Sequence, residues 1–218
     1  MGQSQAKEND VLILFVDEPV PNSSAKILSK KVTELYEGHQ QFEEQIIKMA
    51  RKNNATLAKI EDYHAPDKKK PYHQGMVSIY SYGNMDSLRK RVESRRDSLD
   101  RVQLNESNEN SLVYFFRPRS MRTNSYDLTI DGKVVIYMKP DSTVIVKPGN
   151  KTELTFSART YANPNSVTMR VQPGKVYYVE CRTIGSPPFS MFPFFSPVDS
   201  HVGRYLFNSV IAQRGRKK

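Results

Sequence analysis

Two histidines and two aspartates lie within twelve residues of one another, and their side chains could bind a metal. His64 and His73 flank a polar loop, and Asp62 and Asp67 lie beside them. Imidazole and carboxylate groups are zinc ligands, and a loop folded back between two strands could bring both imidazoles to one rim. The spacing fits no usual zinc pattern, however, and the run Lys68–Lys70 would repel a cation. We therefore expect no metal and no cofactor, and we expect both imidazoles to hydrogen-bond the loop or solvent.

Cys181 is the single cysteine, which excludes an internal disulfide and a cysteine-rich zinc site. It lies in a strand-like run, where a small buried apolar side chain is the ordinary role of cysteine. The sequence contains no nucleophile elbow, phosphate-binding glycine loop, zinc-protease motif or dinucleotide fingerprint. We therefore expect a protein that is not an enzyme. The alternative is an enzyme whose site is the loop of His64 and His73.

Basic residues are concentrated in the second half of the chain. Residues 1–110 hold 17 basic and 17 acidic residues, so the whole formal excess of +10 lies in residues 111–218. An acidic partner would be attracted to that half by its charge. The candidate ligand-binding residues lie at strand ends and turns, and they are Arg117, Lys133, Lys147, Lys151, Arg159, Lys175 and Tyr178. For Arg117, a structural pair with Asp131 is favoured over contact with an anionic ligand.

Binding of nucleic acid or another polyanion through this basic half is an alternative function. No strand combines aromatic and basic residues in the pattern of RNA-binding surfaces. We therefore expect no sequence-specific recognition of nucleic acid. Any binding to polyanions should be non-selective and should weaken steeply as salt is added.

The elements that must position these residues begin with a small α+β unit over residues 10–83. Strand-like runs at 11–16 and 25–38 precede a helix-like run at 38–54, and two further strand-like runs follow it. Phe42, Ile46 and Met49 with Ala50 form one apolar helical stripe. The order predicts a ββαββ unit in which the helix packs on one face of a small antiparallel sheet.

The pattern of residues 84–110 predicts a charged linker helix. Its apolar residues form a thin stripe of Leu88, Val92, Leu99 and Val102. The stripe is too short for a coiled-coil seam, which needs three or more regular heptads. Acidic residues alternate with the arginines, so a solvated face is favoured over an RNA-binding one. We expect this helix to lie across one domain or between two.

Residues 111–210 predict an all-antiparallel β-sandwich, which completes an α+β fold. Seven short alternating runs between residues 111 and 185 are separated by turn signals. Asp131-Gly132 between two such runs predicts a type I′ hairpin turn. The proline-broken segment Phe189–Phe195 is expected to form a strap that buries Met191, Phe192 and Phe195. An exposed aromatic patch for a membrane or a protein is the alternative.

Both halves resemble bacterial envelope domains of the Bacteroidetes type. In residues 10–83 the resemblance lies in short motifs: Glu18-Pro19, Ala50-Arg51-Lys52, Asn53-Asn54-Ala55, Lys59-Ile60, His64-Ala65-Pro66-Asp67 and His73. Tyr72 stands where that family often has a cysteine, so no thiol role carries over. Residues 111–210 resemble an uncharacterised lipoprotein β-sandwich domain, and more distantly surface-layer-type sandwich repeats. Their motifs are Val113–Pro118, Ile130–Lys133, Val146–Asn150 and Val171–Val179.

The resemblance implies a non-enzymatic binding or scaffold protein of the cell envelope. Its partner would be another envelope protein or an anionic surface polymer. Residues 1–10 are polar and rich in small residues, which fits the mature start of an exported protein or an ordinary disordered start. We therefore expect a periplasmic, outer-membrane-associated or secreted protein, with possible membrane association through a lost N-terminal anchor. A cytoplasmic location is the alternative.

Overall fold

The computed structural model describes residues 11–35, 38–119, 124–160, 163–185 and 191–215. The expectations for the polar start and for Phe189 lie outside these ranges. No helix of the described residues is long and apolar enough to cross a membrane.

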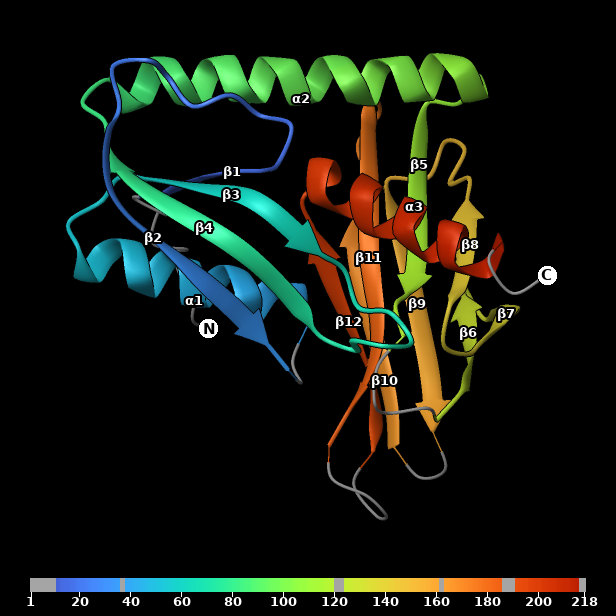
Figure 1. The fold of residues 1–218 in the computed structure, drawn as a ribbon. Helices are drawn as coiled ribbons and strands as arrows, with labels where there is room; N and C mark the ends of the chain where they lie inside the picture. Colours follow the sequence, from blue (N-terminus) through green and yellow to red (C-terminus); the bar gives the residue numbers. More distant parts are fainter. Residues whose placement is uncertain (1–10, 36–37, 120–123, 161–162, 186–190, 216–218) are drawn as a thin grey trace, which may run out of the picture.

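The fold is mixed α+β, as the sequence predicts (Figure 1). In chain order the elements are β1 (Leu12–Leu14), β2 (Ala25–Glu34), α1 (His39–Lys52), β3 (Leu57–His64), β4 (His73–Ser81), α2 (Met85–Ser107), β5 (Ser111–Arg117), β6 (Tyr126–Ile130), β7 (Lys133–Met138), β8 (Ser142–Val146), β9 (Glu153–Thr160), β10 (Asn163–Arg170), β11 (Lys175–Ile184), β12 (Phe192–Val198) and α3 (Ser200–Gly215).

The first sheet has the strand order β1-β3-β4-β2, and α1 packs on it. Phe42, Ile46 and Ala50 of the predicted helical stripe are fully buried. The expectation of a wholly antiparallel sheet is wrong, because β1 pairs with β3 in parallel. Parallel pairing needs a crossover connection, and here the segment from β2 through α1 supplies it.

Strand β2 turns one side toward the core. Val32 is buried and Leu28 packs against the same core, whereas Ile27 and Leu35 are exposed. Leu28 lies four positions before Val32 and therefore shares its face, while Ile27 and Leu35 are an odd number of positions away and face outward. Ile27 lies where the pairing with β4 shifts register, between Lys26 and Leu28.

The other two sheets have the orders β10-β9-β6-β7 and β12-β11-β5-β8. All seven strands predicted between residues 111 and 185 form, and their facing sides share one apolar core that includes Phe115, Phe156 and Cys181. Asp131 and Gly132 both have positive φ, 47° and 81°, as a type I′ turn requires. The expectation of all-antiparallel pairing is wrong here too, since β11 and β5 are parallel.

The described part of the expected strap is a strand, β12, which pairs with β11 along its length. Met191 and Phe195 are buried as expected, and Phe192 is half-buried. The prolines of β12 are tolerated because this strand lies at the edge of its sheet. The helix α3 that follows was not predicted.

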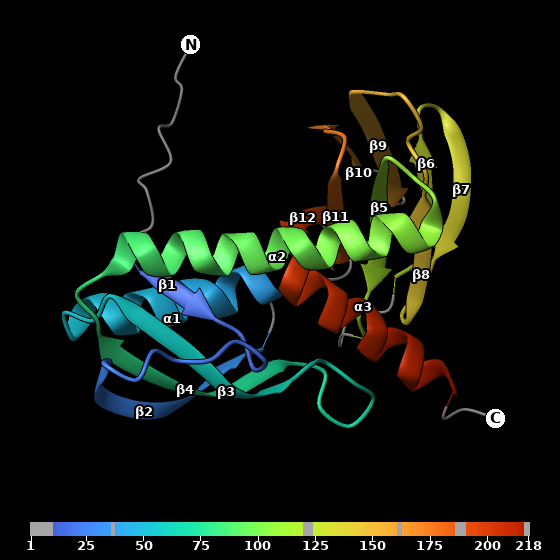
Figure 2. The same cartoon turned by 90° about the horizontal axis from the view of Figure 1, so that it is seen from above.

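Helices α2 and α3 join the two halves of the molecule. Seen from above in Figure 2, α2 runs across the first sheet and the later sheets, and α3 lies beneath it against β5 and β11. Gly203 lets α3 approach the sheet closely, because a Cβ there would lie 2.2 Å from the Cβ of Tyr178. One apolar cluster therefore includes Phe42 of α1, Tyr114 of β5 and Leu206 of α3.

Candidate functional site

Three of the predicted lysines meet at one hollow of about 260 Å³ where the two later sheets open. Lys133 begins β7, Lys147 follows β8, and Lys151 precedes β9. The rest of the lining is mostly apolar and comes from Ile130, Val135, Val146, Pro148 and Leu154. The hollow therefore combines an apolar floor with three positive charges.

Two of these lysines have acidic partners. Lys147 Nζ lies 2.9 Å from Glu109 Oε1, and Lys151 bonds Asp131 at the β6–β7 turn. The hydrogen bonds from Lys151 and from the backbone of Thr155 hold the pKa of the Asp131 carboxyl below its usual range. Among the ion pairs of the described residues, none includes Lys133, so its charge is available to an incoming group.

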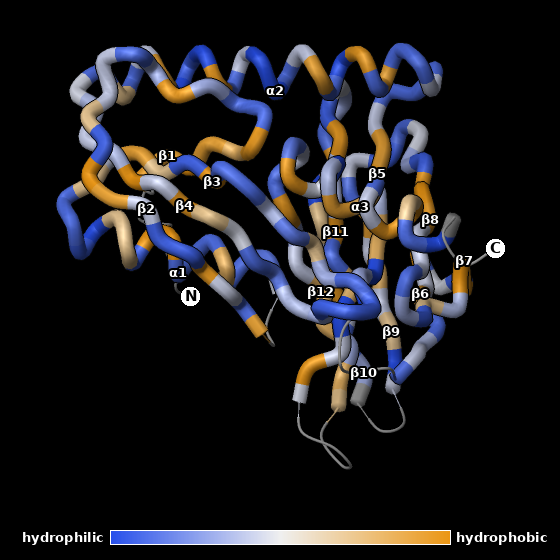
Figure 3. The backbone as a smooth tube through the Cα atoms, viewed as in Figure 1, coloured by the Kyte–Doolittle hydropathy of each residue, from blue (hydrophilic) through white to orange (hydrophobic). Residues whose placement is uncertain are grey.

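Exposed apolar side chains lie along β7. Val135 lines the hollow, whereas Val134 and Tyr137 pair in register with Thr129 and Asp127 and so face the other side of the sheet. Val134 and Tyr137 are 62% and 60% exposed, and Val135 is 41% exposed. The pairing of β6 with β7 skips Val135, which forms a bulge, and β7 is the last strand of its sheet. The orange segments of β7 in Figure 3 lie at the side of the molecule. A large apolar side chain at a sheet edge marks a surface that another chain can cover.

The remaining predicted site residues lie elsewhere. Arg159 is exposed on β9, with Asp127 of β6 as its register partner. Lys175 is half-buried, and its Nζ lies 2.8 Å from Asp97 of α2. Tyr178 is buried against α3 and exchanges hydrogen bonds with Gln103.

Arg117 is buried inside the β-sheet half. It donates to Met138 O at 2.9 Å and to Thr183 Oγ1 at 2.8 Å, and its guanidinium lies over the ring of Tyr126. The expected pair with Asp131 is wrong, since Asp131 bonds Lys151 instead. Arg117 therefore holds β5, β7 and β11 together from within.

His64 and His73 point to opposite faces of the first sheet. His64 pairs in register with Gln74, so their side chains share one face of the sheet. His73 directly precedes Gln74 and therefore projects from the other face. The His64 imidazole faces Lys70 O and Asp67 in the loop, as expected. The same expectation is wrong for His73, which is 3% exposed and buried. No group of three or more potential metal ligands occurs among the described residues.

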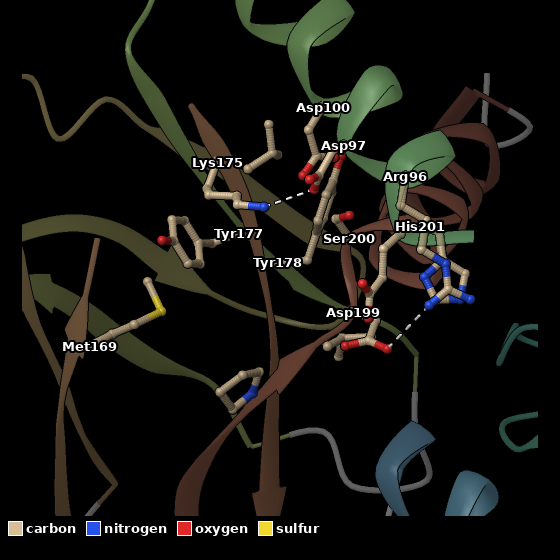
Figure 4. Close-up of a pocket in the computed structure, with 14 residues that line it drawn as sticks. Arg96, Asp97, Asp100, Met169, Lys175, Tyr177, Tyr178, Asp199, Ser200 and His201 are labelled. Carbon is tan, nitrogen blue, oxygen red and sulfur yellow. Dashed lines mark hydrogen bonds and ion pairs between the residues drawn. The ribbon is translucent and has the colours of Figure 1, made fainter. Parts of the chain in front are cut away.

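A larger groove, of about 500 Å³, lies between α2, β11 and the start of α3 (Figure 4). Its charged side chains are largely engaged with one another across elements. Arg96 binds the Glu18 carboxylate through Nε at 2.7 Å and Nη2 at 2.8 Å. Asp97 pairs with Lys175, and Asp100 pairs with Arg204. We interpret the groove as an ion-pair seam that fastens α2 to the body.

His201 closes one end of this seam as a neutral side chain. Burial and the nearby charge of Arg96 lower the pKa of its imidazole to about 3. The sequence does indicate this seam, but only when charged residues are counted together with apolar ones along α2. Residues Leu88, Val92, Arg96, Asp100 and Leu104 recur every fourth position and mark the inner face of α2.

A row of polar side chains in contact with one another lies at the junction of α1, β3, β4 and β11. His39 Nε2 lies 3.1 Å from Glu43 Oε1, and His39 Nδ1 lies 2.8 Å from the Tyr63 hydroxyl. That hydroxyl lies 2.6 Å from His73 Nδ1, and His73 Nε2 lies 3.5 Å from Glu180 Oε1. The row connects two carboxylates through two imidazoles and one phenol.

A backbone amide and one guanidinium support the Glu180 end of this row. The backbone N–H of His39 donates to Glu180 Oε2 at 3.2 Å, and Arg182 Nε lies 3.8 Å from the same oxygen. Burial by itself would raise the pKa of Glu180, but the charge of Arg182 and the contact with His73 lower it to about 2. Glu180 is therefore a buried carboxylate anion.

Cys181 follows Glu180 in β11 but faces the other side of the strand, where it is fully buried in the core between the two later sheets. Burial raises the pKa of its thiol to about 12, so the reactive thiolate is suppressed.

The chain matches no model of a protein family, no curated protein and no solved structure.

Proposed function

We propose that this chain is a non-enzymatic binding protein that docks an acidic segment of a partner protein on the hollow of Lys133, Lys147 and Lys151. The observation that carries the proposal is the meeting of three lysines from separate strand ends over one apolar floor. The proposal treats residues 10–83 as a small ββαββ unit and residues 84–110 as a connecting helix. Residues 111–210 would be a β-sandwich that presents the surface.

The size of the hollow supports a protein partner over a free small molecule. Sites for drug-sized ligands measure about 300–1,000 Å³, whereas this hollow measures about 260 Å³. It suits one or two side chains of a larger partner. Lys133 would receive an acidic group, since it has no ion-pair partner among the described residues.

The apolar side chains of β7 support a partner with apolar residues beside its acidic ones. A bare anionic polymer would be attracted to the lysines but would gain nothing from the apolar lining of the hollow, which includes Val135, 41% exposed. The free energy gained by burying apolar surface does not depend on the screening of charges. Added salt, by contrast, screens exposed charges and so weakens the attraction between them. Salt therefore distinguishes the two kinds of partner.

The cell-envelope setting is proposed on the sequence resemblance of both halves. The partner would then be another envelope protein, met in the periplasm or at the outer membrane. Fractionation of cells that express the native gene, with immunodetection of the protein, tests the setting. Recovery in the cytoplasm alone would overturn it without affecting the proposed surface.

NMR titration tests the surface with two probes, poly-glutamate and a peptide that alternates glutamate with leucine. We expect the mixed peptide to shift the amide signals of β7 and of the three lysines, and to remain bound at about 200 mM salt. Poly-glutamate should bind weakly and be released, because exposed ion pairs contribute only about 0.2–1 kcal/mol each.

Lys133→Glu is the test variant, and Lys48→Glu is its control because it makes the same charge change at an exposed site on α1, far from the hollow. We expect Lys133→Glu to weaken binding of the mixed peptide roughly tenfold and Lys48→Glu to change it little. Equal losses in both variants would mean unspecific attraction to net charge. Retention of poly-glutamate at high salt would favour an anionic polymer as the natural partner.

A further inference from the structure

When both histidines are neutral, the row has fewer hydrogens available for donation than it has contacts between its side chains. Three hydrogen bonds join Glu43, His39, Tyr63 and His73, and an imidazole–carboxylate contact of 3.5 Å joins His73 to Glu180. Each of the four contacts is favourable only with a hydrogen between its two heavy atoms. A neutral imidazole supplies one hydrogen, and a phenol supplies one. Two imidazoles and the Tyr63 hydroxyl therefore supply three, and one contact is left with two acceptors facing each other.

The position of the missing hydrogen depends on which way the Tyr63 hydroxyl points. If Tyr63 donates to His39, then His73 must donate to Tyr63, and His73 Nε2 faces Glu180 without a hydrogen. If Tyr63 donates to His73, the gap moves to the contact between His39 and Glu43. Two unprotonated acceptors in contact are costly at the Glu180 end, where both side chains are buried and neither can turn to water. At the other end the Glu43 side chain is 29% exposed.

One additional proton closes the gap at either end. A His39 imidazolium donates through Nε2 to Glu43 and through Nδ1 to Tyr63. Tyr63 then donates to His73, and His73 donates to Glu180. All four contacts are made, and no hydrogen is left over.

The charges around the row favour the same proton. Burial opposes ionisation of Glu43, but the charge and the hydrogen bond of His39 lower the pKa of its carboxyl. With Glu180 also ionised and Arg182 close by, the row without the proton carries one net negative charge. The additional proton neutralises this charge, and burial of a net charge is costly.

The groups that face the row from other elements keep their charge near neutral pH. Arg96 of α2, which acts on Glu43, remains protonated and is bound to Glu18. On α3, His201 has a pKa of about 3, and burial raises the pKa of Tyr205, whose hydroxyl donates to Tyr63 O. Asp199, directly before α3, also faces the row: burial and the charge of Glu43 raise the pKa of its carboxyl, and the charges of Arg96 and His39 act in the opposite direction.

We propose that Glu43, His39, Tyr63, His73 and Glu180 form a site that binds one proton in neutral solution and thereby ties α1, β3 and β4 to β11. Burial lowers the pKa of His73, and the contact with Glu180 acts in the opposite direction. Loss of the proton at higher pH leaves one contact without a hydrogen, so the junction between the first sheet and β11 loosens.

Nitrogen-15 NMR of the imidazoles tests the proton count directly. In the unaltered protein at pH 7 we expect one imidazole of the pair to carry hydrogens on both nitrogens, and the other to carry one. Glu43→Gln is the decisive variant, because the amide of glutamine supplies the fourth hydrogen to His39 Nε2 without an added proton. Both imidazoles should then be neutral at pH 7.

Glu44→Gln is the control, since this exposed neighbour on α1 makes the same charge change outside the row. Relative to that control, we expect Glu43→Gln to lower the pH midpoint of imidazole protonation by at least about one unit, a tenfold loss of proton affinity. Tyr63→Phe, which divides the row, should act in the same direction, and Tyr205→Phe should not. Two neutral imidazoles in the unaltered protein at pH 6 to 7, or equal shifts in the two glutamine variants, would overturn the proposal.

Discussion

Glu180 shows how a buried charge can be held by partners from distant parts of the chain. It is 1% exposed, and its oxygens contact the backbone N–H of His39, the imidazole of His73 and the guanidinium of Arg182. An isolated carboxylate would protonate in such a site, but these three donors stabilise the anion. The folded protein therefore binds a proton at Glu180 less readily than the unfolded chain does.

We predict that Glu180→Gln lowers stability at pH 7 and that its cost disappears in acid. The pKa of Glu180 falls from 4.5 to about 2 on folding, so its contribution is present above about pH 4.5 and is lost as the pH falls toward 2. At pH 7 this contribution is on the order of 3 kcal/mol. Urea unfolding at several pH values measures the cost, with exposed Glu153→Gln as control. A cost that stays constant down to pH 2 would contradict the linkage.

The surroundings of His73 could not be deduced from its neighbours in the sequence. Loop residues next to it suggested an exposed imidazole, yet it is buried between Tyr63 and Glu180. Glu180 lies more than a hundred residues further along the chain, on a strand of another sheet. By contrast, the local turn of Asp131-Gly132 was predicted correctly, because the residues that determine it are adjacent.

At the scale of elements, α2 shows that a helix can be fastened by charged side chains as well as by an apolar stripe. Leu88 and Val92 are buried as predicted, but Leu99 and Val102 are 38% and 54% exposed. The inner face continues instead through Arg96, which binds Glu18 with two hydrogen bonds. Apolar spacing alone predicted the helix correctly and its inner face only in part.

We predict that Arg96→Ala destabilises the protein by about 2–3 kcal/mol, because it leaves the buried carboxylate of Glu18 without its main partner. The adjacent Arg95→Ala is the matched control. Arg95 lies 3.6 Å from Asp17, both side chains are about half exposed, and such a pair contributes less than about 1 kcal/mol. Chemical denaturation measures both variants, and equal costs would show that the seam does not stabilise α2.

At the scale of the whole molecule, the boundaries expected at residues 83 and 110 do not coincide with breaks in the core. One apolar cluster includes Ile46 of α1, Leu104 of α2, Phe116 of β5 and Phe207 of α3. The individual strands could be predicted because alternation is local. Their neighbours could not, and the parallel pairs β1–β3 and β5–β11 depend on residues far apart in sequence.

We predict a single cooperative thermal transition for the whole chain, because the shared cluster makes each half depend on the other. Far-ultraviolet circular dichroism reports helices and strands, and near-ultraviolet signals report the packed tyrosines at the junction. The two transitions should coincide. Two separate transitions would instead support the independent units of residues 10–83 and 111–210 that the sequence predicts.

The position of α3 in the shared core has a consequence for synthesis on the ribosome. Val202, Leu206, Phe207 and Val210 complete a cluster that begins at Val11, yet α3 is translated after every other element. The first sheet and α1 therefore emerge long before the helix that covers their junction with β5 and β11. Until then, apolar surface at this junction stays open to solvent, and surfaces of this kind are the ones that chaperones protect. The apolar core around the first sheet therefore cannot be completed until α3 has left the ribosomal exit tunnel.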